Sequence, residues 1–158
     1  MNLLFIENNG ANFSLNRNYR FVLWRIWNRT LPLVMYIGLN PSTANETKPD
    51  PTITRLVGMT KNLGYGGFYM LNLFTYVSAY PEELKKVQYT LVDADLNLVK
   101  YSKLVQDIVF CWGNFKEAED RGKEVIKMFP GAYCFGKNKN GSPKHPLYLK
   151  SDIKLNKF

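Results

Sequence analysis

Short segments dominated by apolar residues recur along the chain, and each is followed by glycine or polar residues. These segments lie at 33–37, 68–74, 106–113 and 132–136 and contain β-branched or aromatic residues, as do strands that are buried on both faces of a sheet. The stretches between them carry apolar residues at helical spacing. The repeated strand–loop–helix order predicts an α/β fold, a three-layer α/β/α sandwich with a central, mostly parallel four-stranded sheet.

Helix signals agree with this order. Apolar residues at helical spacing predict helices at 50–62, at 80–104 with a break before 93, and at 115–129. Asp50 is expected to cap the first helix, with Pro51 at its first position. The glycine-rich stretch 64–67 closes this helix and opens a strand, whereas a phosphate-binding loop follows a strand and opens a helix. We therefore interpret it as a turn.

The two ends of the chain are less regular. We expect a single domain over residues 1–158, with an N-terminal arm at 1–18 and a basic C-terminal loop and tail at 137–158. The arm is an edge strand or an irregular segment, and the stretch 19–27 fits a strand or a short amphipathic segment. The arginines nearby are either solvated side chains beside buried aromatics or phosphate contacts; they are Arg20, Arg25 and Arg29.

Charge adds a candidate partner. The chain has 158 residues, with 21 lysines and arginines against 13 acidic residues, which gives a net charge of +8 and an isoelectric point near 9.5. This balance favours a polyanionic partner, and an aromatic content of 15% suits stacking on bases. The sequence therefore indicates a nucleic acid or a nucleotide as partner.

Metal and membrane chemistry find little support in the sequence. The two cysteines, Cys111 and Cys134, lack metal-ligand spacing and the chain has a single histidine, so we expect buried thiols, no metal and no cofactor. No apolar run approaches the length of a membrane span, and the apolar start at 1–7 is too short for a signal peptide. We expect a soluble cytoplasmic protein, and the oligomeric state stays open.

Polar residues and turn formers follow the first apolar segment. They are Gly38, Asn40, Pro41, Ser42 and Thr43. In open α/β sheets, ligands bind beyond the carboxyl ends of the strands. This loop is therefore either a binding site or an ordinary strand-to-loop turn.

A second asparagine, Asn72, lies late in the second segment and is followed by Phe74 and Tyr76. A buried amide needs partners, so Asn72 either satisfies a neighbouring loop or reads the edge of a bound base beside a stacking aromatic. His145 lies in a loop after the fourth segment, framed by prolines and lysines. A parallel sheet would bring this loop to the same edge as Asn40 and Asn72.

Positive charge is densest near the C-terminus, where Lys137 and Lys144 lie. Arg55 faces away from the apolar stripe of the first predicted helix. These three side chains are candidates for phosphate contacts, or they are solvated.

The chain resembles a bacterial and phage family of uncharacterised proteins over most of the range 19–149. The resemblance is carried by Ile-Gly-Leu-Asn-Pro-Ser-Thr-Ala at 37–44, Asp-Pro-Thr at 50–52, Gly-Tyr-Gly-Gly at 64–67, Asn-Leu-Phe at 72–74, Trp-Gly at 112–113 and Gly-Ser-Pro-Lys-His-Pro-Leu-Tyr-Leu at 141–149. This resemblance implies a family and no activity.

Three motifs are also similar, more distantly, to those of the uracil-DNA glycosylase superfamily. Gly38-Leu39-Asn40-Pro41 resembles its first motif, Asn72 the asparagine late in its next strand, and His145-Pro146 its final loop. The order of the motifs agrees. The resemblance implies a glycosylase-like sandwich that hydrolyses the N-glycosidic bond of a damaged or modified base in DNA.

Under this resemblance each motif residue has a role. Asn40 would hold the attacking water, and His145 would stabilise the charge that builds on the departing base. Asn72 would hydrogen-bond the flipped base. One aromatic side chain would stack on that base, and the candidates are Tyr65, Phe74 and Tyr76.

Two features depart from the superfamily pattern. The first motif has no aspartate, and the amide of Asn40 does not titrate near neutral pH. Residues 147–149 are Leu-Tyr-Leu, where the glycosylases carry small residues and a side chain that wedges into the duplex. The alternatives are a non-catalytic module that binds a nucleotide or nucleic acid, and an inhibitor of a protein partner.

Overall fold

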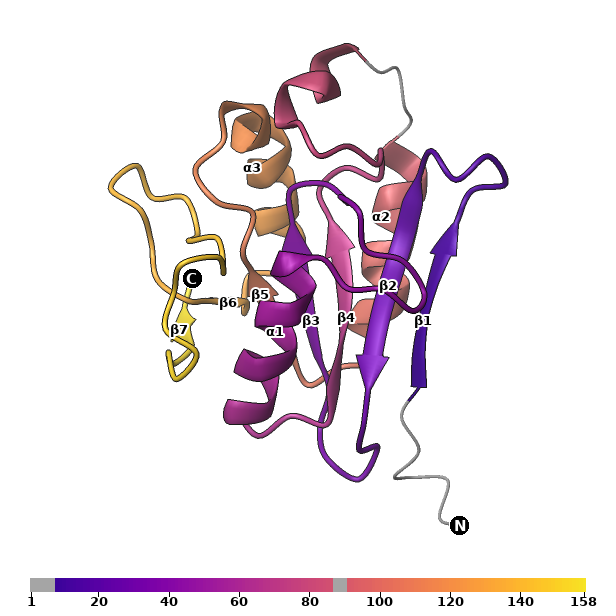
Figure 1. Cartoon of the computed structure of the whole chain (residues 1–158). Coiled ribbons are helices and arrows are strands. Elements are labelled where there is room, and N and C mark those ends of the chain that lie inside the picture. Colours follow the sequence, from indigo (N-terminus) through magenta and orange to yellow (C-terminus); the bar gives the residue numbers. More distant parts are fainter. Residues whose placement is uncertain (1–7, 87–90) are drawn as a thin grey trace.

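The computed structural model describes residues 8–86 and 91–158, which form one seven-stranded mixed sheet with helices on both of its faces (Figure 1). The strands are β1 (Asn8–Phe13), β2 (Arg20–Ile26), β3 (Val34–Gly38), β4 (Gly67–Asn72), β5 (Asp107–Phe110), β6 (Tyr133–Cys134) and β7 (Asn156–Lys157). The helices are α1 (Pro51–Asn62), α2 (Leu91–Ser102) and α3 (Glu119–Met128), with short 3-10 helices η2 (Pro81–Lys86) and η3 (Lys116–Ala118).

The predicted four-stranded, mostly parallel sheet of the glycosylase type is wrong. The strand order is β1-β2-β4-β3-β5-β6-β7. The pairings among β4, β3, β5 and β6 are parallel, whereas β1, β2 and β7 pair antiparallel at the two edges. Antiparallel pairings are therefore as numerous as parallel ones in the described part of the chain.

The sequence concealed the added strands for physical reasons. Arg20 and Arg25 interrupt the apolar run of β2, yet their side chains are only 3% and 5% exposed because backbone carbonyls accept their hydrogen bonds. β1 is the edge strand that was one alternative for the N-terminal arm, and residues 1–7 lie outside the described residues. β7 is two residues long, too short for a periodic pattern.

The helix predictions are largely confirmed. The Oδ1 of Asp50 accepts a hydrogen bond from the backbone N of Ile53 at 2.9 Å, and Pro51 is the first helical residue of α1. Residues 64–67 form the predicted turn into β4. The part of the second predicted helix at 87–90 lies outside the described residues.

Two apolar layers hold the helices to the sheet. On one face α1 packs through Leu56 and Met59 against Tyr36 and Phe68 in one buried cluster. On the other face α2 and α3 contribute to a second buried cluster, in which Leu98, Tyr101 and Val125 meet Leu71 and Phe110. Figure 1 shows α1 on the near side of the sheet, with α2 and α3 behind it. Both cysteines are buried free thiols, as predicted.

The loops that follow the parallel strands lie together at the carboxyl ends of these strands, where backbone hydrogen bonds join them. The N of Ser78 donates to the carbonyl of Pro41 at 2.9 Å, and the N of Gly113 donates to that of Pro143 at 3.0 Å. Because β2 is antiparallel to β4, it begins at this same end of the sheet. The backbone N of Arg20 there donates to the carbonyl of Thr75, which follows β4. Side chains from the parallel strands and from the antiparallel strand β2 therefore meet at this end of the sheet.

Among the described residues, no helix combines the length and the apolar composition needed to cross a membrane.

Candidate functional site

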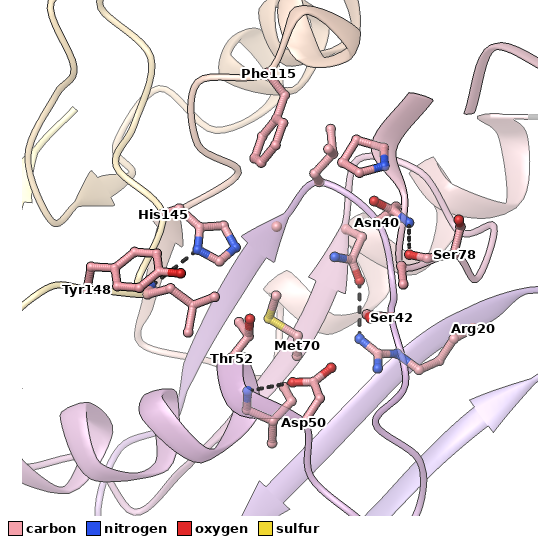
Figure 2. A pocket seen from close by; sticks show the side chains of 17 residues that line it. Arg20, Asn40, Ser42, Asp50, Thr52, Met70, Ser78, Phe115, His145 and Tyr148 are labelled. Atoms are coloured by element: carbon pink, nitrogen blue, oxygen red, sulfur yellow. Dashed lines mark hydrogen bonds between the residues drawn. The ribbon is translucent and has the colours of Figure 1, made fainter. Parts of the chain in front are cut away.

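A pocket of about 450 Å³ lies at the carboxyl ends of β3 and β4, and we call it the strand-end pocket (Figure 2). The ends of β3 and β4, the start of β2, the start of α1 and the loops around 78–81, 115 and 145–148 line it. The size suits a small organic ligand. The polar side chains that line it are Arg20, Asn40, Ser42, Asp50, Thr52, Asn72, Ser78 and His145.

Asn72 presents an unpaired donor in this pocket. It is the last residue of β4 and the register partner of Gly38 on β3. Its side chain is 5% exposed, its Oδ1 accepts from Nη2 of Arg20 at 3.4 Å, and its Nδ2 has no hydrogen-bond partner among the described residues. A buried amide N–H without an acceptor is costly, so this donor suits a ligand.

Arg20 supplies a buried positive charge beside Asn72. Its Nη1 donates to the carbonyl of Ala44 at 3.2 Å, and its side chain is 3% exposed. Burial lowers the pKa of Arg20 to about 10, and the nearby charge of Asp50 acts in the opposite direction. The guanidinium is therefore charged at neutral pH and can only donate hydrogen bonds.

Asn40 is held by its amide nitrogen, which leaves its oxygen available. The Nδ2 donates to three backbone carbonyls, those of Pro41 at 3.1 Å, Tyr76 at 3.3 Å and Ser78 at 2.9 Å. No described residue donates a hydrogen bond to Oδ1 of Asn40. Asn40 therefore offers the strand-end pocket a fixed hydrogen-bond acceptor.

His145 is held in one tautomer. Its Nδ1 accepts a hydrogen bond from the backbone N of Leu147 at 3.2 Å, so in the neutral ring the proton is on Nε2. Figure 2 shows that Nε2 points toward the middle of the strand-end pocket. Burial lowers the pKa of His145, and the charge of Asp50 offsets only part of this effect. At neutral pH the ring is an uncharged donor.

Asp50 brings a carboxylate to the same pocket. Its Oδ1 and Oδ2 accept hydrogen bonds from the backbone N of Ile53 at 2.9 Å and of Ala44 at 3.3 Å. The carboxylate thus caps α1 and also holds the loop after β3. Its negative charge partly compensates the buried charge of Arg20.

Apolar side chains complete the walls. Met70, Phe115 and Leu147 line the strand-end pocket, and the ring of Phe115 lies edge-on to His145 with 6.4 Å between ring centroids. Gly113 has a φ of 83°, and a Cβ there would stand 2.9 Å from Phe115 and 3.2 Å from His145, so this glycine lets both rings approach. Apolar walls beside polar groups that can fix the orientation of a ligand suit a heterocycle.

The structure brings five of the predicted residues together in the strand-end pocket. They are Gly38, Asn40, Ser42, Asn72 and His145. Pro41 is buried in the same loop, and Thr43 is exposed; neither lines the pocket. Phe74 is buried in the core beneath α2 and α3, and the ring of Tyr76 packs edge-on to Tyr19 at 5.8 Å.

Tyr65 lies at the opposite end of the parallel strands, just before β4 begins. Its hydroxyl donates to the Oδ2 of Asp107, at the start of β5, at 2.5 Å, and burial raises its pKa. It therefore lies outside the strand-end pocket, so the stacking residue proposed from the resemblance is not Tyr65 in this fold. Phe115, which lines the pocket, packs its aromatic ring edge-on to His145.

The predicted phosphate contacts also lie outside the pocket. Arg55 borders a separate, open hollow with Pro51 and Gly58. The ammonium group of Lys137 lies 4.5 Å above the centre of the Phe158 ring. Lys144 follows Pro143 in the loop and is half-buried.

Sequence reasoning missed several residues of the strand-end pocket, among them Arg20, Asp50, Phe115 and Met70. From the sequence, Arg20 is expected to be a solvated side chain or a phosphate contact, and Asp50 a helix cap. Phe115 and Met70 carried no signal beyond hydrophobicity. A buried arginine cannot be recognised from sequence, because its partners are carbonyls and an amide on distant loops.

In the described ranges, no group of three or more His, Cys, Asp and Glu side chains is arranged to hold a metal ion. The strand-end pocket holds a buried arginine, two amides, one imidazole and one carboxylate whose two oxygens already accept backbone hydrogen bonds, a set that suits an organic ligand better than a cation.

A family model described as "Protein of unknown function (DUF1643)" matches residues 20–147. This range contains every residue that lines the strand-end pocket except Tyr148. No curated protein and no solved structure matches the chain significantly.

Proposed function

This chain belongs to the DUF1643 family, and we propose that its strand-end pocket binds a nucleobase and hydrolyses the N-glycosidic bond that joins the base to its sugar. One observation carries the proposal. Three residues, one at the end of β4 and two in loops, line one cavity, and one polar atom of each has no hydrogen-bond partner among the described residues: Nδ2 of Asn72, Nε2 of His145 and Oδ1 of Asn40.

The shape and chemistry of the pocket support a base as ligand. A volume of about 450 Å³ accommodates a base with part of its sugar. A base is flat and apolar on its faces and carries donors and acceptors on its edge, which fits Met70 and Phe115 as walls and Asn72 as reader. The net charge of +8 supports a phosphate-bearing partner.

The same groups support a hydrolytic reaction. The Oδ1 of Asn40 would hold a water against the anomeric carbon, and the C–N bond would break with its electron pair moving onto the base. The Nε2–H of neutral His145 would donate a hydrogen bond to that developing charge. The water then supplies the hydroxyl to the sugar and a proton to the base.

A specific observation favours binding without hydrolysis as the second candidate. Both oxygens of Asp50 already accept backbone N–H bonds, and Asn40 does not titrate. The described residues of the pocket thus offer no uncommitted general base, and a slow reaction or none would follow. In that case the protein is a nucleotide- or nucleic-acid-binding module.

Product analysis tests the proposal. Oligonucleotides carrying uracil, hypoxanthine, hydroxymethyluracil or mismatches, single- and double-stranded, are incubated with the protein and with His145→Ala. Tyr65→Phe is the matched control, because Tyr65 lies at the opposite end of the parallel strands from the pocket. Thermal melts check that each variant folds.

Three outcomes separate the candidates. Abasic sites that form with the native protein and Tyr65→Phe but not with His145→Ala would establish a glycosylase. A saturable complex without product, weakened by salt, would establish the binding module. Neither product nor complex would remove both and leave a protein partner to be sought.

A further inference from the structure

Helix α2 carries apolar side chains on two opposite faces. One face packs against the sheet, and its buried residues are Ala94, Leu98 and Tyr101. A second row of apolar residues has the same spacing but begins two residues earlier, which is about 200° around the helix axis. It consists of Val92, Leu96 and Val99, which are 63%, 63% and 42% exposed. This row faces solvent, and we call it the outer stripe of α2.

The outward faces of the other two helices are polar by comparison. The exposed residues of α3 are all charged, and they are Glu119, Asp120, Lys123, Glu124 and Lys127. Those of α1 are Pro51, Thr54, Lys61 and Asn62. Single exposed apolar side chains are common on folded proteins, whereas a continuous row of them indicates an interaction surface. The outer stripe is therefore suited to a partner.

Two opposite charges lie along one side of the outer stripe. Asp93 and Lys100 are both exposed, and their separation of seven residues sets them on the same side of the helix, about 10 Å apart along its axis. The Nζ of Lys100 lies 5.3 Å from the centre of the Tyr101 ring. No described residue forms an ion pair with Asp93 or Lys100, so both charges are available to a partner.

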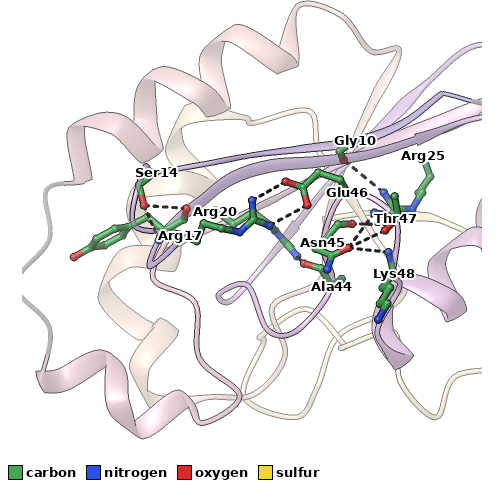
Figure 3. A network of polar contacts seen from close by, with 11 residues as sticks. Gly10, Ser14, Arg17, Arg20, Arg25, Ala44, Asn45, Glu46, Thr47 and Lys48 are labelled. Atoms are coloured by element: carbon green, nitrogen blue, oxygen red, sulfur yellow. Dashed lines mark hydrogen bonds and ion pairs between the residues drawn. The ribbon is translucent and has the colours of Figure 1, made fainter.

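Comparable charges elsewhere in the fold have partners within the chain. Arg17 donates to both carboxylate oxygens of Glu46, at 2.8 and 2.9 Å (Figure 3). On the side of α2 nearest to α3, Asp95 accepts a hydrogen bond from Nη2 of Arg121 at 2.6 Å. The two available charges lie on the other side of the outer stripe from Asp95.

We infer that the outer stripe of α2 is a contact surface for a second copy of this chain, with the two α2 helices antiparallel. A two-fold axis that crosses the stripe between residues 96 and 97 lies midway between Asp93 and Lys100. It sets Asp93 of each copy beside Lys100 of the other and brings the two Leu96 side chains together near the axis. The outer stripes then bury one another, and each charge meets an opposite one.

The charges also select the direction of the second helix. In a parallel arrangement the first turns of the two helices, each with Asp93 and Asp95, would lie side by side. Lys100 would lie at the other end of the contact. Like charges that face one another oppose association, so the antiparallel arrangement is favoured.

The size of this surface implies a weak dimer. Stable interfaces bury about 800 Å² on each partner, and one helix face with three aliphatic side chains provides less. We therefore expect a dissociation constant of about 10–100 μM, with monomers predominating in dilute solution. No residue of α2 lines the strand-end pocket, so association leaves the pocket open. The inference thus stands apart from the proposed function.

Sedimentation equilibrium measures this association directly. One copy has a mass of 18.3 kDa, and the average mass is followed from about 1 to about 500 μM protein, which brackets the expected constant. The salt concentration is held at about 0.15 M, because a net charge of +8 makes the copies repel one another at low ionic strength. Thermal melts check that each variant folds.

Leu96→Gln removes the centre of the outer stripe, and Leu31→Gln is its matched control. Leu31 is also an exposed leucine, but it lies in the loop between β2 and β3. The native chain and Leu31→Gln should approach twice the monomer mass at high concentration. Leu96→Gln should associate at least about tenfold more weakly. Both side chains are exposed, so both variants should fold.

Charge reversal tests the antiparallel pairing. Asp93→Lys and Lys100→Asp each set like charges against one another at both contacts, so each should associate at least about tenfold more weakly than the native chain. An equimolar mixture of these two variants restores opposite charges at both contacts, and so does the double variant that carries both changes. The mixture and the double variant should therefore return to within about threefold of native association.

Three results would overturn the inference. A native chain that stays at 18.3 kDa over the whole range would show that the stripe binds no second copy. Association that Leu96→Gln keeps at native strength would place the contact on another surface. Single charge variants that associate like the native chain, or a mixture that associates no better than its components, would exclude the antiparallel pairing of Asp93 with Lys100.

Discussion

Gly38 and Asn72 are register partners on β3 and β4, and the missing side chain of the glycine leaves room for the amide of the asparagine. A Cβ on Gly38 would stand 2.9 Å from Nδ2 of Asn72 and 2.6 Å from the terminal methyl of Met70. Both distances are too short for ordinary contacts. The glycine is therefore part of the strand-end pocket through the space that it leaves.

Gly38→Ala should damage the pocket more than the fold. The methyl group displaces the Asn72 amide, so we expect at least about tenfold weaker binding of the ligand. The cost in the free energy of unfolding should be about 1–3 kcal/mol, as for overpacking elsewhere in cores. Calorimetric titration and urea denaturation measure the two effects.

Gly58→Ala is the control for that substitution. Gly58 lies in α1 and an added Cβ meets nothing within 4 Å. Alanine should raise the free energy of unfolding by about 0.5–1 kcal/mol and leave binding unchanged. Native-like binding by Gly38→Ala would contradict the role given to Asn72.

His145 should titrate below the ordinary range. It is the single histidine of the chain, so its Cε1 proton gives one imidazole resonance. Burial lowers the pKa of the ring below the ordinary value of 6.5, and the NMR titration should have its midpoint below that value. A midpoint at or above 6.5 would show that the ring is charged near neutrality and contradict the neutral donor.

The same shift makes stability depend on pH. Because the folded pKa of His145 lies below the unfolded one, the unfolded chain binds more protons between the two values. The stabilising effect of the neutral ring is present above the unfolded pKa and is lost as the pH falls through 6.5 toward the folded pKa. Melting curves of His145→Gln, which has no ionisable ring, should lack this part of the pH dependence.

Tyr36 and Thr60 form a buried hydroxyl pair that fastens α1 to the sheet. The two oxygens lie 2.8 Å apart, and the Thr60 hydroxyl donates to the carbonyl of Leu56 at 2.5 Å. Thr60→Val should lower the free energy of unfolding by about 1–3 kcal/mol, since the Tyr36 hydroxyl is left buried without an acceptor.

The double variant Tyr36→Phe with Thr60→Val should recover part of that loss, because no polar group then stays unpaired. Chemical denaturation of the single and double variants gives the coupling. Additive losses would mean that the two hydroxyls do not depend on one another.

Tyr148 at the rim of the strand-end pocket combines backbone strain with exposure. Its φ is 70° and its side chain is 99% exposed, although left-handed backbone costs a side-chain-bearing residue about 1–2 kcal/mol. Tyr148→Gly should raise the free energy of unfolding by up to about 1 kcal/mol, partly offset by the added freedom of the unfolded chain.

The same variant should bind ligand more weakly, since the ring lines the pocket. Tyr148→Phe keeps both the ring and the strain, so it should retain native affinity and native stability. Equal affinities for all three proteins would show that the ring at 148 does not contact the ligand.

The apolar segments determined the central strands and most helix positions. The runs that became β3 and β4 are continuous and bounded by turn residues, and Asp50-Pro51 marks a helix start that needs no tertiary information. Polar residues at the ends of β3 and β4 likewise identified Asn40 and Asn72 as candidates. Local sequence suffices here because periodicity and capping act over a few residues.

Only the tertiary structure decided the edges of the sheet and the contents of the pocket. Arg20 reads as a charged residue near an ambiguous segment, yet the antiparallel β2 sets it beside β4, where its partners are an amide and a carbonyl from distant loops. Tyr65 is the opposite case: the sequence made it a candidate for the site, yet it lies at the other end of the parallel strands, outside the strand-end pocket.

The sequence by itself therefore determined which segments form the parallel strands, where α1 begins and which polar residues stand at the strand ends. The tertiary structure decided that Arg20, Asp50 and Phe115 join Asn72 and His145 around one cavity, and which hydrogen-bonding atoms stay available there. The physical reason is range: strand and helix signals are local, whereas burial of a charge and the orientation of an amide depend on partners tens of residues away.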